Sequence, residues 1–531
     1  MLFARATQPS TKAQAVASTK TFLAPKAGLI KNENIANPSK LGAEWMDNWF
    51  PTAEGCRMRK GSDLHGTIAA AVTHFAAYEA GAISKLFATS ASAIYDITTP
   101  ADPTVSPAAA VSGLLSGDWS SAQFTNSGGS FLMMANGADN LHRYDGSSWL
   151  AITGVSTGAI TGVATTGLSA VWKFKSRLFF VQGGSMSAWY LGVNSISGAA
   201  TELPLGAIFS EGGSLLFGAS VSYDAGNGPD DFCVFVTTNG EMAVYQGSDP
   251  SSASTWAIVG TYRIGRPIHK NAWFKAGGDV GILTDDAVVS VLSAMKTDRA
   301  GLRKSAISFP IETLWRKAVD ERFSGVLPFS CVMWPAQTML VVGVPANSSQ
   351  SKYNFAVNTG TGAWTRFTGW DIRCLIVYKD SLYFGTSSGT IVQGDVTGSD
   401  QGEPYSAVVI PKMSTFGAPT EKVALHCRMV ARANNEFAPQ LFACADYEVD
   451  IPTVLDADPD SGANVWGVAI WGQFTWGANS DQKVRQSEWQ SVAATGMALA
   501  PGLQITSGRE TAPDVELISM LLVYEDGQVM G

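Results

Sequence analysis

A repeating pattern of short apolar strands and tight turns dominates the sequence after residue 70. In each unit a strand leads into a turn of Gly, Asn or Asp and then into a second strand with a large residue near its end. These second strands carry the markers Tyr95, Tyr144, Tyr190, Tyr245 and Val291, at intervals of roughly 50 residues. Such repeats are typical of β-propeller blades. The sequence therefore predicts an all-β chain with a propeller of six or seven blades.

The composition agrees with many short strands. Of 531 residues, only 15% are charged, 54 are glycine and 16 are tryptophan, which favours turns and packed sheets over helices. One helical segment stands out, because Ile311, Leu314, Trp315 and Ala318 fall at helical spacing. We expect a helical insertion between blades near residues 310–321.

Three parts are predicted along the chain. Residues 1–40 are rich in Ala, Thr, Lys and Pro with little periodicity, and we expect an extended arm there. Residues 41–401 are assigned to the propeller. From Gly402 the apolar segments become longer and alternate more regularly, which predicts an antiparallel β-sandwich over residues 402–531.

Charge is distributed unevenly over these parts. The whole chain carries a formal charge of -9, whereas six cations against one glutamate give residues 1–40 a charge of +5 and leave -14 for the rest. A basic arm on an acidic body suggests docking on an acidic partner. The candidate docking residues are Arg5, Lys12, Lys20, Lys26 and Lys31.

Three short motifs suggest chemistry, and each has a plainer interpretation. GTSSG places Ser387 in a nucleophile-elbow pattern, but a strand follows where the elbow needs a helix, so a hairpin turn is favoured. Asp456, Asp458 and Asp460 alternate as in a calcium loop, without the closing glutamate, so an acidic solvated loop is the alternative. SDPSSASTW around Asp249 loosely resembles the Asp-box turn of sialidases, with a different spacing.

Other residue types predict neither a cofactor nor a resident metal. The five histidines are isolated, the six cysteines are scattered, and nucleotide-binding glycine motifs are not found. Such cysteines usually pack as small buried residues in a reducing compartment. Sixteen tryptophans could line a sugar site but more often fill the core between blades. We expect no membrane-spanning segment, no enzymatic activity and synthesis in a cytoplasm.

Several stretches resemble the tail hub or nozzle proteins of short-tailed bacteriophages. They are LGAEWMDNWFPTAEGCRMRKGSDLHGTI (41–68), TWAIVGTYRIGRPIHKNAWFKAGGDVGILTDDAVVSVLSAM (255–295), GAWTRFTGWDIRCLIVYKDSLYFGTSSGTIVQGD (362–395) and VELISMLLVYEDGQVMG (515–531). The resemblance implies a virion protein that forms a ring, typically a homohexamer, below the portal and adaptor. Its implied partners are the adaptor, a tail fibre or tailspike, and the packaged double-stranded DNA that the tube retains and later conducts.

The basic cluster after EWMDNWFPT has two interpretations. Arg57, Arg59 and Lys60 could contact the DNA end if they face the lumen. A solvated strand end or a contact with a neighbouring subunit is the plainer interpretation of so short a cluster. The aromatic residues before it are expected to anchor the first blade, with a turn at Pro51.

Two rival functions come from other classes of protein. The tryptophans would suit a carbohydrate-binding propeller that recognises a receptor. A propeller hydrolase would need clustered carboxylates or arginines at the channel mouth. Neither rival accounts for the basic arm or for the strands after residue 402, so the tail protein is the leading expectation.

Overall fold

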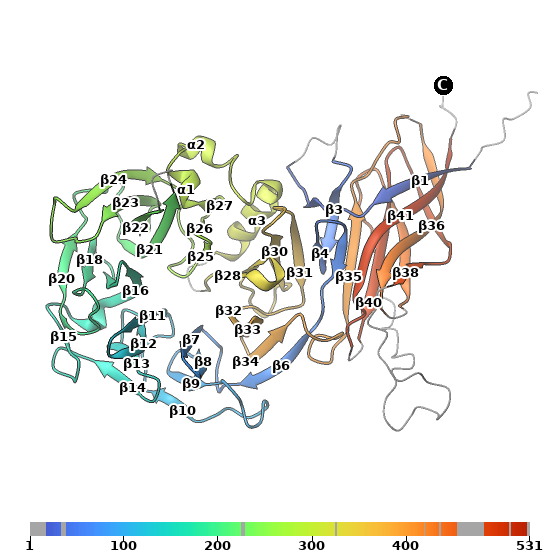
Figure 1. The fold of residues 1–531 in the computed structure, drawn as a ribbon. Helices are drawn as coiled ribbons and strands as arrows, with labels where there is room; N and C mark the ends of the chain where they lie inside the picture. The colour runs from blue at the N-terminus through green and yellow to red at the C-terminus, as the bar shows by residue number, and fades with distance from the viewer. Residues whose placement is uncertain are drawn as a thin grey trace, which may run out of the picture.

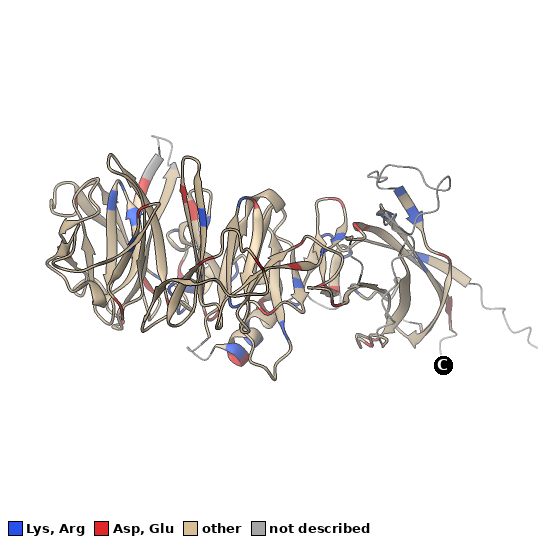
Figure 2. Cartoon of the chain, turned by 90° about the horizontal axis from the view of Figure 1, so that it is seen from below, with Lys and Arg blue, Asp and Glu red and all other residues tan. Residues whose placement is uncertain are grey.

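The computed structural model describes residues 17–32, 39–224, 229–323, 327–418, 420–434, 437–453, 483–508 and 511–527. Two bodies lie side by side: a ring of small sheets and a second body built from two larger sheets (Figure 1). In the view of Figure 2, basic and acidic residues are interspersed along both bodies. None of the helices in these ranges is both long and apolar enough to cross a membrane.

Six discrete sheets of three or four strands form propeller blades. The first three comprise β7 (His74–Ala80), β8 (Ile83–Thr89), β9 (Ala93–Asp96) and β10 (Ala109–Ser112); β11 (Ser120–Asn126), β12 (Gly129–Ala135), β13 (Leu141–Tyr144) and β14 (Trp149–Ile152); and β16 (Leu168–Phe174), β17 (Arg177–Gln182), β18 (Ser187–Tyr190) and β20 (Thr201–Pro204). β15 (Ile160–Thr161) and β19 (Gly198–Ala199) form a short parallel pair.

The next two blades comprise β21 (Leu215–Asp224), β22 (Pro229–Thr237), β23 (Glu241–Gly247) and β24 (Trp256–Arg263); and β25 (Trp273–Ala276), β26 (Asp279–Leu283) and β27 (Val288–Ser290). The sixth discrete blade joins β32 (Cys374–Tyr378), β33 (Ser381–Gly385) and β34 (Thr390–Gly394) to β6 (Ser62–Thr67). Because β6 precedes the first blade in sequence and pairs with the last propeller strand, it closes the ring.

One further meander completes the ring: β28 (Ser330–Trp334), β29 (Met339–Gly343), β30 (Tyr353–Asn358) and β31 (Trp364–Thr368). It lies between the three-stranded blade and the closing blade, and it also belongs to a nine-stranded sheet of the second body. The predicted all-β propeller of six or seven blades is confirmed: six blades are discrete sheets, and the β28–β31 meander is shared with the second body.

The marker residues of the repeat occupy equivalent places in the blades. Tyr95, Tyr144, Tyr190 and Tyr245 all lie on the third strand of their sheets, and all four are buried. Val291 follows the third strand of the next blade and begins α1 (Val291–Ala294). A buried aromatic ring on each third strand therefore explains why the repeat is visible in the sequence.

The helical insertion expected near residues 310–321 is present. α2 (Arg299–Leu302), the 3₁₀ turn η2 (Phe309–Ile311) and α3 (Glu312–Arg322) follow α1. The other 3₁₀ turns are η1 (Thr165–Gly167) and η3 (Pro335–Gln337). α3 buries Trp315 and Ala318 against the core, and the Trp315 indole Nε1 donates to the carbonyl of Thr284 at 3.0 Å.

The second body contains two sheets around one shared hydrophobic core. The nine-stranded sheet runs β28-β29-β30-β31-β2-β3-β35-β40-β37, with β2 (Gly28–Leu29), β3 (Gly42–Asp47), β35 (Tyr405–Pro411), β40 (Leu499–Ser507) and β37 (Pro439–Ala445). The seven-stranded sheet contains β38 (Lys483–Gln486), β36 (Lys422–Ala433), β41 (Val515–Asp526), β5 (Cys56–Met58), β4 (Trp49–Pro51), β1 (Ala17–Leu23) and β39 (Gln490–Gly496).

The strand pairing differs from the sequence expectation at the N-terminal end. Residues 17–23, part of the expected extended arm, form a strand against β41, and β3 pairs with β35 instead of opening the first blade. Both partners lie more than 350 residues away in sequence, so no local pattern reveals them. The boundaries at residues 40 and 401, and the β-sandwich over residues 402–531, stay predictions. Arg5 and Lys12 lie outside the described residues.

Packing between neighbouring blades can be tested at Gly218. A Cβ added there would clash with the indole ring of Trp172, which is itself packed against Phe235. We expect Gly218→Ala to lower the free energy of unfolding by about 1–3 kcal/mol, measured by urea denaturation, because an overpacked core must shift. The matched control is Gly167→Ala, where an added Cβ meets nothing within 4 Å. Equal stability of the two variants would contradict the packing described here.

Candidate functional site

The basic residues predicted to contact DNA lie at the junction of the two bodies. Arg57 and Lys60 are held by Asp395: the Arg57 guanidinium lies 3.0 Å from its carboxylate, and the Lys60 backbone N–H donates to it at 2.7 Å. Arg59 is paired with Asp400 through two bonds, at 3.0 and 2.6 Å. The structure therefore brings the three residues together, each beside a carboxylate that follows β34.

Arg59 is fully enclosed, with a side-chain exposure of 0%. Besides Asp400, its guanidinium donates to the Asn48 side chain at 2.8 Å and to the carbonyls of Lys60 and Thr368 at 2.9 and 3.0 Å. These five bonds use all five N–H donors of the group. The proposed DNA contact is therefore wrong for Arg59, because a buried and saturated guanidinium cannot reach a phosphate.

Aromatic rings cover both faces of the same guanidinium. Its Cζ lies 4.5 Å from the centroid of the Trp370 ring and 4.2 Å from that of Tyr405. The Tyr405 hydroxyl donates to the Arg59 carbonyl at 2.5 Å, and burial raises the pKa of that hydroxyl far above its usual range. Ion pairing and cation–π contact thus fix one residue between β5, β31 and β35.

The described lysines of the basic arm are mostly engaged within the chain. Lys31 and Lys412 both form ion pairs with Glu44. Burial opposes ionisation of Glu44, but these two partners outweigh it and lower its pKa. The Lys26 ammonium donates to the carbonyl of Ala53 at 3.2 Å, whereas Lys20 is exposed on β1. Of the described arm lysines, Lys20 and Lys40 are exposed and are the ones best placed for a partner.

The other sequence candidates have structural roles or lie outside the described residues. Ser387 lies in the turn between β33 and β34 and donates to Asp371, as the hairpin interpretation predicts. Asp249 accepts bonds from Ser251 inside the β23–β24 turn. Asp456, Asp458 and Asp460 lie outside the described residues. Within the described ranges, no group of three or more His, Cys, Asp or Glu side chains could hold a metal ion.

The cysteines and tryptophans mainly serve the core. All six cysteines are free thiols, five of them buried and Cys331 partly so. Among the described tryptophans, Trp489 is the one exposed to a large extent. The expectation that tryptophans fill the space between sheets is therefore confirmed for this part of the chain.

A polar segment crosses the middle of the propeller ring. Residues 269–271 precede β25, and they contact the segment before β11 of a blade that is not a neighbour. The Lys270 ammonium donates to the carbonyls of Asp118 and Ser169 at 2.6 and 2.9 Å. The Asn271 amide donates to the carbonyl of Trp119 at 2.7 Å. We call residues 269–271 the cross-channel segment.

Charged and titratable groups surround this segment. Asp118 pairs with His269 and Lys270, each at 3.1 Å. Burial disfavours the charged form of Asp118, yet these two partners lower its pKa to about 2. His74, at the start of β7, has a pKa lowered to about 4 by burial; the charge of Asp118 opposes this shift, and the charges of Lys270 and His269 add to it. These groups hold the crossing segment in place.

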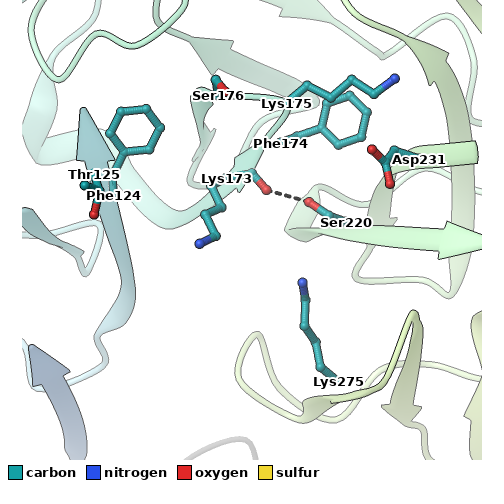
Figure 3. A pocket seen from close by; sticks show the side chains of 9 residues that line it. All are labelled: Phe124, Thr125, Lys173, Phe174, Lys175, Ser176, Ser220, Asp231 and Lys275. Carbon is teal, nitrogen blue, oxygen red and sulfur yellow. Dashed lines mark hydrogen bonds between the residues drawn. The ribbon is translucent and has the colours of Figure 1, made fainter. Parts of the chain in front are cut away.

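A cavity of about 370 Å³ lies near the ends of β11, β16 and β25, whereas the cross-channel segment lies at the beginnings of these strands. It contains three lysines, one aspartate and several hydroxyl groups (Figure 3). The lining residues are Phe124, Thr125, Lys173, Phe174, Lys175, Ser176, Ser220, Asp231 and Lys275. We call this cavity the lysine pocket. The sequence does not reveal this pocket, because its lysines come from different blades, although Lys173 and Lys175 alternate around the buried Phe174.

Comparison with known proteins does not assign a function to this chain, so the function is argued from the residues described above. No protein-family model and no curated protein matches the chain. The β-propeller domain of Cps50 (Swd1) from Myceliophteria thermophila is 12% identical, over 63% of this chain and 100% of that domain, with a TM-score of 0.37. The extracellular domain of the putative one component system BT4673 from B. thetaiotaomicron is 10% identical, over 76% of this chain and 53% of that chain, with a TM-score of 0.38.

The junction can be tested by substituting Arg59. Arg59→Met removes the cation and leaves the Asp400 carboxylate without its charge partner, so we expect the free energy of unfolding to fall by about 3–5 kcal/mol. Arg59→Lys keeps the charge but cannot form the same fork of bonds, and an intermediate loss is expected. Urea denaturation measures both variants. Lys60→Gln is the neighbouring control, and a loss there as large as in Arg59→Met would contradict this account.

The pH dependence of stability can be tested at His74. Its pKa is about 4 in the folded chain, against an ordinary histidine value of 6.5. The unfolded chain therefore binds more protons between these values, and stability falls as the pH is lowered from 6.5 to 4. We expect His74 to contribute about 2 kcal/mol to this loss, less than the full shift because the ring keeps some solvent contact.

The measurement is the free energy of unfolding, from urea denaturation, of the wild type and of His74→Gln at pH 7.5, 6 and 4.5. A shift of one pKa unit corresponds to about 1.4 kcal/mol of this free energy. The variant should lose less stability on acidification than the wild type. His142, whose pKa burial also lowers, remains in both proteins and cancels in the difference. Parallel curves for the two proteins would show that His74 is not responsible.

Proposed function

We propose that this chain is a structural subunit of the tail hub or nozzle of a short-tailed bacteriophage. In this proposal it is assembled in the host cytoplasm into a ring, a homohexamer by resemblance, in the virion tail. The ring lies below the portal and adaptor, carries a tail fibre or tailspike, and retains the packaged double-stranded DNA until ejection. The proposal includes no catalytic step.

The observation that carries the proposal is the sheet shared by the two bodies. β31 belongs to the propeller ring, and it is joined through β2 and β3 to β35 of the second body. A subunit that resists the pressure of packaged DNA must not hinge between its parts. Backbone hydrogen bonds that continue across the junction, reinforced by the enclosed Arg59–Asp400 pair, suit that mechanical role.

The acidic body supports the same proposal. Residues 41–531 carry a formal charge of -14, so a wall built from them would repel a polyanion passing along it. A wall rich in cations would instead hold the DNA through counterion release. Arg57 and Arg59 form ion pairs with Asp395 and Asp400, so their positive charges are neutralised within the chain and would not attract DNA to such a wall.

A carbohydrate-binding propeller is the second candidate, and the lysine pocket favours it. The pocket is concave, lies where inner strands of several blades end, and offers cations and hydroxyl groups to a ligand. A ligand site at the mouth of a propeller channel would suit recognition of a receptor glycan. The tail-subunit proposal is preferred because it also uses the second body.

The test is quantitative peptide mass spectrometry of purified DNA-filled particles, with the portal protein as the internal reference. Half as many copies of this chain as of the portal is the expected result for a ring on the tail axis. A ratio well above one half would favour a peripheral receptor-binding role. Absence of the chain from the particles would contradict the proposal.

A further inference from the structure

The propeller channel has two different ends. Asp118, Trp119 and Ser169 lie at the beginnings of β11 and β16, where they accept hydrogen bonds from the cross-channel segment. The lysine pocket lies toward the ends of the same two strands, at Thr125 and Lys173. β25 links both ends, since residues 269–271 precede it and Lys275 lies near its end. The pocket is therefore the mouth of a channel that is crossed by chain at the other end.

Two lysines from different blades enter this mouth. The side chains of Lys173 and Lys275 extend from different blades into the same space (Figure 3). Burial and the charge of Lys173 both lower the pKa of Lys275, and Asp231 opposes them. Two like charges that share one pocket repel each other. An anion between them would remove that cost.

Carboxylates of the described chain do not neutralise this group. In the described ranges, no carboxylate oxygen lies within 4.0 Å of the ammonium of Lys173, Lys175 or Lys275. Asp231 is the single acidic residue lining the pocket, and it already accepts a bond from the Ser222 hydroxyl at 2.6 Å. Three lysines against one aspartate leave a positive site on a chain whose net charge is -9.

The dimensions and the remaining lining groups limit the ligand to a small molecule. A volume of about 370 Å³ lies near the lower end of the range for small-molecule sites. Thr125 and Ser176 add hydroxyl groups to the lining. The Ser220 hydroxyl already donates a hydrogen bond to the backbone carbonyl of Lys173 at 2.5 Å. The buried rings of Phe124 and Phe174 make the floor apolar, which strengthens charge–charge attraction above it.

We propose that the lysine pocket binds a small ligand that carries an oxyanion group, as a phosphate or sulfate ester does. The oxyanion lies between Lys173 and Lys275, which enter the pocket from different blades. The proposal is independent of the tail function, because it concerns a site on the propeller alone. Binding and virion incorporation can therefore fail separately.

Isothermal titration calorimetry on the full chain tests the site with two probes. Pyrophosphate represents the phosphate source, and a heparin-derived disaccharide with two sulfates represents the sulfated-sugar source. We expect at least one probe to bind, with affinity that falls as sodium chloride is added. The Lys173→Gln/Lys275→Gln double variant should bind at least tenfold more weakly, because two charge-assisted bonds are lost.

Two further variants give the experiment its controls. Lys317→Gln removes an exposed lysine on α3 that pairs with Glu321, and its affinity should equal that of the wild type. Asp231→Asn removes the opposing charge and should strengthen binding severalfold, an effect that misfolding cannot imitate. No binding of either probe to the wild type, or equal affinity in the wild type and the lysine double variant, would overturn the proposal.

Discussion

The enclosed pair of Arg59 and Asp400 is the interaction on which the two-body arrangement depends. Arg59 follows β5, where the chain leaves the second body toward β6, and Asp400 lies where the chain returns from β34 toward β35. The entry and exit of the propeller are thus fastened to one another. A solvated pair would add little to stability, but a guanidinium with all five donors bonded and both faces covered by rings is costly to separate.

Closure of the ring by β6 makes the two bodies interdependent. The first strands of the chain are committed to sheets whose other members come after residue 329, and the next strand, β6, pairs with β34. Neither sheet system is complete until nearly the whole chain is present. Contacts of such sequence separation are formed slowly, because the entropy of closing long loops must be lost before the contacts form. The glycines and buried tyrosines of each blade offset this by making the local hairpins favourable.

The blades could be predicted from the sequence because their information is local. A turn and a pair of short strands recur in the blades, and four of them share a buried Tyr, so the repeat is visible without knowledge of the tertiary contacts. The pairing of β1 and β3 could not be predicted, since alternating apolar residues fit many partner strands. Arg59 illustrates the same limit for sites: a basic cluster looks solvated in sequence, and only the approach of Asp400, Trp370 and Tyr405 from over 300 residues away encloses it. Lys173 and Lys275 likewise become neighbours only when the ring closes.

The cross-channel segment places a constraint on any conduit built from this chain. The side chains of Lys270 and Asn271 bond to backbone carbonyls of other blades, so polar side chains reach across the ring at that level. A DNA duplex cannot pass through the propeller without breaking these buried bonds. If the tail-subunit proposal holds, the lumen must therefore lie between copies of the chain, with each propeller to one side of it.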